Sequence, residues 1–154
     1  MRELRWIAAA LLLVVVAAGC ESCGEPVEPA QRMVIHAVEV IQYDPNYFED
    51  TVDEGLPDLY VEIRDHASQS MYFTTVVEDE ASVPQWFDVE AISVERENFS
   101  VVMEILVFDY DLATTQDPIA IGLTFSPADF AVDRPETRTV LVGANEVLLH
   151  LNWY

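Results

Sequence analysis

Apolar and polar residues alternate along two segments of the chain, as they do in a β-strand with one buried face. In residues 58–65 (DLYVEIRD), leucine, valine and isoleucine fall on one face, and tyrosine, glutamate and arginine fall on the other. In residues 147–154 (VLLHLNWY), valine, two leucines and tryptophan alternate with leucine, histidine, asparagine and tyrosine. Each segment therefore predicts a half-buried strand.

Further short apolar segments are rich in Val, Ile, Leu, Tyr and Phe and are separated by clusters of Pro, Gly and Asp, which favour turns. The only helical indication is a single turn at residues 127–130. Eight short strands at this spacing predict an all-β fold, an eight-stranded antiparallel β-sandwich. The other six predicted strands are residues 33–41, 71–77, 86–89, 101–108, 119–125 and 139–143.

The first twenty residues have the layout of a secretory signal. Arg2 and Arg5 give a basic start, residues 6–18 form an apolar run, and small residues lead to Cys20. The apolar run is too short to span a hydrocarbon core of about 30 Å comfortably. We therefore expect export across a membrane.

The sequence Ala17-Ala18-Gly19-Cys20 resembles the lipobox of bacterial lipoproteins, with Ala17 at a position where many lipoboxes carry Leu. The resemblance implies that residues 1–19 are a signal peptide and that Cys20 is diacylated, cut free and acylated again. Several acyl chains on one cysteine give stable anchoring. The expected location is the bacterial cell envelope, at the outer membrane or the periplasmic face of a membrane. The alternative is an ordinary secreted protein in which Cys20 has no special role.

From Cys20 onward, the chain has five arginines, no lysine and 27 acidic residues, for a formal charge of −22. Nucleic acid is an implausible partner, because proteins bind it by neutralising its phosphates with basic side chains, of which this chain has few. An anionic membrane would repel the domain unless cations intervene. Two cysteines are too few for a disulfide framework. We interpret residues 20–31, which include Cys23, as the lipidated cysteine and a flexible linker, and residues 32–154 as one domain.

Three carboxylates lie in the short segment 107–122, VFDYDLATTQDPIAIG, between two apolar strands. Asp109 and Asp111 share a face while the backbone is extended, and Asp117 can fold back toward them. Carboxylates that converge in a loop repel one another unless a cation lies between them, and Ca²⁺ accepts many oxygen ligands in flexible geometry. In so acidic a chain, solvated surface carboxylates are the alternative.

Five segments in the correct order resemble C2 domains, the calcium-dependent phospholipid-binding β-sandwich modules. Residues 55–61 (GLPDLYV) are similar to the family's Gly-x-Ser-Asp-Pro-Tyr-Val signature, and residues 107–122 are similar to its third calcium loop. The resemblance implies a C2-type sandwich over nearly all of the domain. The remaining matches are the opening strand at residues 34–42, the Thr-x-Val to Pro-x-Trp stretch at residues 75–86, and the short turn at residues 126–130.

The C2 resemblance implies Ca²⁺ as the cofactor, bound by Asp58, Asp109, Asp111 and Asp117, with Thr114 as a weaker candidate. In the first loop the family's aspartate position is occupied by Val52. One carboxylate of the longer loop 43–55 is expected to complete the site, with Asp53 as the first choice. The other acidic residues of that loop are Asp44, Glu49, Asp50 and Glu54.

Apolar residues accompany the same loops, with Phe48 in the first and Leu112 in the third. In C2 domains such residues dip into lipid once bound calcium removes the repulsion between acidic loops and phosphate. Packing of both side chains against the rim of the sandwich is the alternative.

An enzyme is not expected. The three histidines, His36, His66 and His150, are far apart in sequence, and no nucleophile motif, glycine-rich phosphate loop or Cys-His metal spacing is present. The sequence predicts a lipid-anchored protein whose C2-type domain binds calcium and docks to phospholipid or an envelope protein. The alternative is a metal-independent β-sandwich lipoprotein that acts as an assembly scaffold.

Overall fold

The computed structural model describes residues 28–44, 56–110 and 117–154, and every strand in them belongs to one β-sandwich. No helix in these three ranges is long and apolar enough to cross a bilayer. The eight strands are β1 (Arg32–Gln42), β2 (Leu59–Asp65), β3 (Met71–Thr74), β4 (Gln85–Glu95), β5 (Met103–Asp109), β6 (Asp117–Phe125), β7 (Thr137–Val142) and β8 (Asn145–Trp153).

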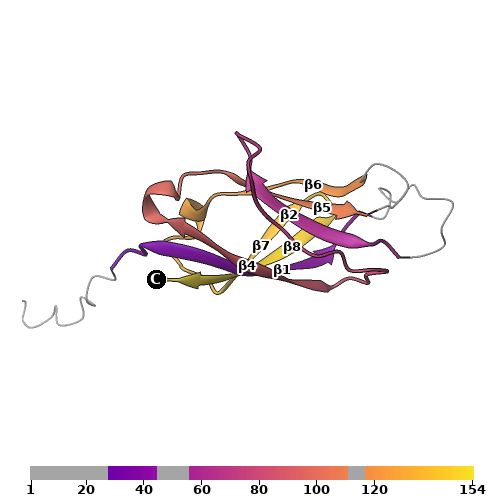
Figure 1. Cartoon of the computed structure of the whole chain (residues 1–154). Helices are drawn as coiled ribbons and strands as arrows, with labels where there is room; N and C mark the ends of the chain where they lie inside the picture. The colour runs from indigo at the N-terminus through magenta and orange to yellow at the C-terminus, as the bar shows by residue number, and fades with distance from the viewer. Residues whose placement is uncertain (1–27, 45–55, 111–116) are drawn as a thin grey trace, which may run out of the picture.

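The strands form two four-stranded antiparallel sheets that face each other (Figure 1). One sheet has the order β4-β1-β8-β7, and the other has the order β3-β2-β5-β6. The predicted eight-stranded antiparallel sandwich is therefore confirmed. The predicted turn after β6 is a 3₁₀ turn, Pro127–Asp129.

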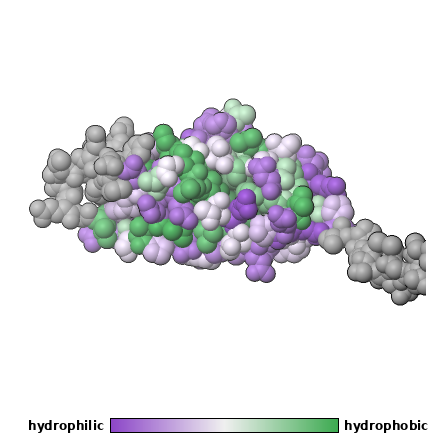
Figure 2. Space-filling model, turned by 180° about the vertical axis from the view of Figure 1, so that it is seen from behind, coloured by the Kyte–Doolittle hydropathy of each residue, from purple (hydrophilic) through white to green (hydrophobic). Residues whose placement is uncertain are grey.

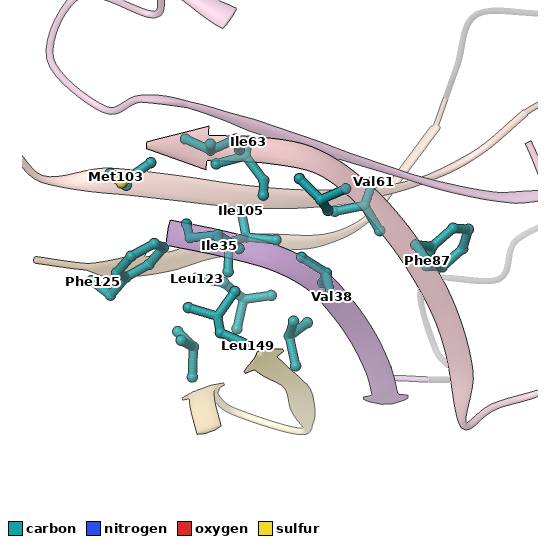
Figure 3. Close-up of a cluster of buried hydrophobic side chains, with 14 of the residues drawn as sticks. Ile35, Val38, Val61, Ile63, Phe87, Met103, Ile105, Leu123, Phe125 and Leu149 are labelled. Atoms are coloured by element: carbon teal, nitrogen blue, oxygen red, sulfur yellow. The ribbon is translucent and has the colours of Figure 1, made fainter. Parts of the chain in front are cut away.

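The core lies between the inner faces of the two sheets, where alternate residues of each strand meet (Figure 3). Ile35 and Leu149 from one sheet pack with Ile63 and Ile105 from the other, and all four side chains are fully buried. The predicted inward positions of β2 and β8 are buried, Leu59, Val61 and Ile63 in β2 and Val147, Leu149 and Leu151 in β8. Tyr60, which the pattern places on the outer face of β2, is also buried. Burial of a side chain of this size contributes about 1.5–3 kcal/mol, so this layer is the main source of stability.

Strand β4 is longer than the sequence predicts, because a register shift interrupts its alternation of buried and exposed residues. Its register against β1 shifts where Ile35 pairs with Ile92 and Ala37 pairs with Asp88. The extra residues around Glu90 and Ala91 are exposed, so they break the period-two pattern that predicted a strand of four residues. A second 3₁₀ turn, Arg96–Asn98, follows β4, and the prediction of only one helical turn was wrong.

The two ends of the sandwich carry different residues. We define the loop end by Asp44, Asp58, Glu80, Asp109 and Asn145, which lie where β1, β2 and β5 border the first and third loops. We define the linker end by the opposite termini of the strands, where β1 begins and β8 ends. In Figure 1 the C-terminus and the start of β1 lie together at the linker end. The linker end comprises Glu28–Arg32, Arg96–Phe99, Ala128–Arg134 and Tyr154.

The surface mixes apolar and polar side chains. Figure 2 shows several separate apolar groups among polar ones on one face of the sandwich, with no single continuous apolar band. Exposed large apolar residues include Leu141 on β7 and Ile121 on β6, the strands at one open edge of the two sheets. Scattered apolar residues of this kind are normal on the surface of a folded domain.

Candidate calcium site at the loop end

Three neighbouring strands bring three predicted ligands to the same end of one sheet. In the β2–β5 ladder Asp109 is opposite Leu59, the residue after Asp58, and in the β5–β6 ladder Asp109 is opposite Asp117. Adjacent strands lie about 4.8 Å apart, so the backbones at these positions are close neighbours. The pairing register therefore gathers residues that are far apart in the sequence.

The carboxylates of Asp58 and Asp109 are held by backbone donors. The Asp58 N–H donates to Asp109 Oδ1 at 2.8 Å, and the Glu80 N–H donates to Asp58 Oδ1 at 2.8 Å. The Tyr110 N–H donates to the Asp58 carbonyl oxygen at 2.9 Å. The ionised Asp58 carboxylate has about four acceptor sites, more than the bond from Glu80 occupies, so it can also bind a cation. Both side chains are half-buried, which fixes their positions before any ion binds.

The start of the first loop is fixed against the same site. The Asp44 N–H donates to Oδ1 of Asn145, whose side chain is buried at the β7–β8 turn, at 2.8 Å. The pKa of Tyr43 is raised by burial and then by the negative charge of Asp109. Tyr43 and Asp109 are therefore near neighbours, and the loop that contains Asp44 leaves the sandwich beside Asp109.

An aromatic layer supports the strand ends that carry the aspartates. The Tyr60 ring stacks on Phe108 with centroids 5.0 Å apart and meets the Tyr110 ring edge-on at 6.4 Å. Burial raises the pKa of Tyr60 to about 12, with smaller contributions from Glu62 and Tyr110. These rings keep the ends of β2 and β5 rigid beneath Asp58 and Asp109.

Tyr60→Phe is expected to reduce the loss of stability at alkaline pH. A tyrosine whose folded pKa lies near 12 keeps its proton between pH 10 and 12, while the unfolded chain loses it. Its contribution to the free energy of unfolding is therefore complete below pH 10 and falls as the pH rises to 12. Denaturant unfolding of residues 24–154 at pH 8 and pH 11 should show a smaller difference for Tyr60→Phe than for the parent domain. An equal difference would contradict this assignment.

The structure brings two of the predicted ligands together, Asp58 and Asp109, and pairs the backbone of a third, Asp117, with Asp109. Within residues 28–44, 56–110 and 117–154, no three His, Cys, Asp or Glu side chains are placed close enough to hold a metal ion. Several predicted residues lie outside the described residues, and for them the predictions stand as they were made. They are Asp53, Asp111, Thr114, the membrane-contact candidates Phe48 and Leu112, and the lipidation site Cys20.

Sequence reasoning missed the residues that orient the aspartates. Glu80 contributes only its backbone N–H and adopts a positive φ of 48°, and Asn145 acts from 101 residues away. A backbone donor leaves no signal in side-chain identity. The buried asparagine at the β7–β8 turn is the one feature that the sequence could have indicated, since Asn is common in turns.

Two histidines that are distant in sequence are neighbours in space. His36 and His150 lie on the outer face of one sheet with ring centroids 6.1 Å apart, and the Trp86 ring is 4.2 Å from His150. His150 Nε2 lies 3.5 Å from Glu39 Oε2. This cluster is remote from the loop end, since its residues occupy the middle of β1 and β8, so we do not assign it to the calcium site.

Comparison with solved structures identifies the architecture. The chain matches a C2 domain of a plant Extended Synaptotagmin 1 with a TM-score of 0.54 and 15% identity, covering 82% of this chain and 95% of that domain. The chain has a C2-type fold. No protein-family model matches the sequence, and a comparison with curated protein sequences finds no match.

Two further structures share the C2-type fold. A calcium-bound pair of C2 domains from Extended-Synaptotagmin 2 matches with a TM-score of 0.57 and 24% identity, over 84% of this chain and 47% of that one. Human GIVD cytosolic phospholipase A2, in complex with a fluorophosphonate inhibitor and terbium chloride, matches with a TM-score of 0.59 and 17% identity, over 81% of this chain. The chain spans only 17% of that phospholipase, so the similarity concerns a small part of the enzyme.

Proposed function

We propose that this protein is a lipid-anchored envelope protein whose C2-type domain binds Ca²⁺ at the loop end and docks there to phospholipid or to a protein partner. The observation that carries the proposal is the hydrogen-bonded pair of Asp58 and Asp109, with Asp117 opposite Asp109 in the β5–β6 ladder. These are three of the ligands that the C2 resemblance implies. The activity proposed is binding and not catalysis.

The electrostatics of the loop end favour a cation. Its described carboxylates include Asp44, Asp58, Glu80 and Asp109, and none of the five arginines lies at this end of the described strands. Like charges that share a site destabilise the folded state. Ca²⁺ accepts about six to eight oxygens at roughly 2.3–2.6 Å, a number that Asp58, Asp109, Asp111, Asp117 and a first-loop carboxylate can largely supply. Asp53 remains the first choice for the first loop.

Two structural neighbours support the choice of ion. The Extended-Synaptotagmin 2 domains were solved with calcium bound, and the phospholipase was solved with terbium chloride, another source of hard cations. Calcium at this site would cancel part of the repulsion between the loops and lipid phosphate. A phosphate oxygen could then complete the coordination of the ion.

The anchor in this proposal is Cys20, joined to the domain by the linker of residues 20–31. Its position after a basic start and a short apolar run supports a lipoprotein of the bacterial cell envelope. Because several acyl chains already give stable attachment, the loop end is not needed to hold the protein on a membrane. It is available for a second contact.

One observation favours a second candidate, a metal-independent scaffold. Strand β7 is an open sheet edge on which only Val140 is buried, and Leu141 is 61% exposed. An exposed edge can pair with a strand from a partner. Partner binding that is unchanged by a calcium chelator and lost when proline replaces Leu141 would favour the scaffold over the calcium-dependent domain.

Vesicle sedimentation tests the proposed function. The unlipidated domain, residues 24–154, is expected to sediment with anionic phospholipid vesicles only in the presence of Ca²⁺. Full insertion of Phe48 and Leu112 would contribute roughly 1.5–3 kcal/mol each, so replacing both with Ser should weaken binding at least tenfold. The same double variant should keep its calcium-induced rise in melting temperature, because neither side chain offers a ligand.

A domain that binds Ca²⁺ and ignores vesicles of every composition would contradict lipid docking. The loop end would then be a calcium-braced surface for a protein partner. A matched control is Met71→Ser together with Val102→Ser, which removes two exposed apolar side chains away from the loop end. This control should leave vesicle binding unchanged.

A further inference from the structure

The linker end is tied together by backbone hydrogen bonds where the chain enters and leaves the sandwich. The N–H groups of Gln31 and Arg32 donate to the Tyr154 carbonyl oxygen at 2.7 and 3.0 Å, and the Arg96 N–H donates to the Gln31 carbonyl oxygen at 2.8 Å. Residues 28–32 are therefore held at this end, where β1 begins and β8 ends (Figure 1).

A pocket of about 690 Å³ opens at the linker end. Its apolar lining includes Phe99, whose side chain is buried, and alanines of the segment after β6. Arg96 and Arg134 line the same pocket, and the neighbouring Val132 is 89% exposed. The complete lining is Pro29, Ala30, Arg96, Phe99, Ala128, Ala131, Val132, Asp133 and Arg134.

The two guanidinium groups in this pocket are available to an anion. Of the five arginines in the described residues, Arg64 is the one that forms an ion pair with a carboxylate, Nε to Glu104 Oε2 at 3.3 Å. Arg134 Nη2 donates to the Glu28 carbonyl oxygen at 2.6 Å. Because this acceptor is neutral, the bond does not compensate the positive charge of Arg134. Asp133 is the single carboxylate in the pocket, so two positive groups face one negative group. Guanidinium is well suited to bidentate phosphate contacts.

The length of the linker restricts which end can face the anchoring membrane. Eight residue-to-residue steps lead from Cys20 to Glu28, the residue that Arg134 holds, and they span at most about 26–29 Å. Strand β1 alone, with 11 residues, extends about 33–36 Å from the linker end toward the loop end. The linker is therefore too short for the loop end to contact the membrane that holds Cys20 while the linker end points away from it.

We propose that the linker end seats the domain on the membrane that holds Cys20, with Arg96 and Arg134 on lipid phosphates and Val132 at the lipid surface. The loop end then faces away from that membrane, toward an opposing surface. This inference rests on the proposed lipid anchor. It deepens the proposed function, because it makes calcium-dependent docking an interaction with a second surface.

The mature chain contains two tryptophans at different distances from the linker end, which gives a native probe of orientation. The Trp153 ring packs against Phe99 of the pocket with centroids 6.0 Å apart. Trp86 pairs with Glu39, seven residues along β1 from Arg32, or about 23 Å farther from the linker end. A nitroxide on lipid head groups quenches indole fluorescence only at short range.

The test uses the full mature lipoprotein in phosphatidylglycerol-rich vesicles that contain head-group nitroxide lipid. Trp86→Phe leaves Trp153 as the reporter, and Trp153→Phe leaves Trp86. Quenching of Trp153 should be at least threefold that of Trp86, with or without Ca²⁺. Arg96→Gln with Arg134→Gln should remove most of this difference, whereas the matched control Arg138→Gln should keep it, since Arg138 lies over the Phe130 ring outside the pocket.

Flotation of the same vesicles distinguishes a failure of the proposed orientation from a failure of the proposed lipid anchor. Protein that floats with its vesicles but shows stronger quenching of Trp86, or quenching unaffected by the double arginine substitution, would overturn the orientation alone. Protein that does not float would overturn the anchor and, with it, this inference.

Discussion

Millimolar Ca²⁺ is expected to raise the melting temperature of residues 24–154, and Asp109→Asn is expected to remove most of that rise. An ion that binds only the folded domain stabilises it by about 1.4 kcal/mol when its free concentration is about ten times its dissociation constant, or roughly 5 °C for a domain of this size. Asparagine keeps an Oδ1 that can accept the Asp58 N–H bond of 2.8 Å, so the substitution removes charge and spares the fold.

Two controls distinguish a specific calcium site from general screening of the negative charge. One replaces Ca²⁺ with Mg²⁺, and the other removes a carboxylate charge at the linker end. Mg²⁺ requires near-octahedral geometry and keeps its waters, so its effect should be smaller than that of Ca²⁺. Asp133→Asn removes the same charge at the linker end and should leave the calcium effect intact. Equal shifts from both ions, unchanged by Asp109→Asn, would mean that the ions only screen a formal charge near −22.

Cys20→Ser is expected to abolish lipid attachment completely and to leave the protein soluble or uncleaved. The physical reason is that the diacyl group is attached first, to the Cys20 sulfur, and the serine hydroxyl does not replace the thiol as the nucleophile. Cleavage, and acylation of the amine that it frees, depend on this first step. Metabolic labelling with palmitate and separation of membrane and soluble fractions measure the effect. Cys23→Ser is the matched control and should retain label. Label that survives Cys20→Ser would refute the anchor.

The strands were predictable where one face is buried and the other is solvated. In β2 and β8 the period-two pattern gave the correct buried faces, because those strands lie inside their sheets and pair on both sides. In β4 the pattern failed beyond Val89, because the irregular register near Ile92 turns successive residues outward. Register shifts arise from pairing with another strand, which a local sequence pattern does not contain.

The candidate calcium site was predictable only in part. The spacing of Asp109 and Asp111 within one loop is enough to indicate them as candidate ligands. Asp58 is 51 residues from Asp109 and was assigned as a ligand through the resemblance to C2 domains. The Glu80 N–H, which donates to the Asp58 carboxylate, and the Asn145 side chain, which accepts from the Asp44 N–H, both depend on tertiary contacts. The pocket at the linker end is built from three separate segments, and no single one carries a recognisable motif.

The difference between the two ends of the domain follows from the topology of the sheets. Antiparallel strands β1 and β8 place the chain entry and exit at one end, and their other ends border Asp44 and Asn145. The linker end is connected by the linker to the proposed anchor. The loop end carries several carboxylates, and no arginine of the described strands lies there. The proposed attachment and the proposed calcium-dependent recognition therefore lie at opposite ends of the domain.

The central claim is that Asp58 and Asp109 belong to a specific calcium site, and isothermal titration calorimetry tests it most directly. Titration of residues 24–154 with Ca²⁺ should give a saturable heat with one or two ions per domain. Asp58→Asn and Asp109→Asn should each weaken binding at least tenfold, while Asp133→Asn should leave the dissociation constant within twofold of the parent. Heats that do not saturate, or that all three variants change equally, would contradict the account.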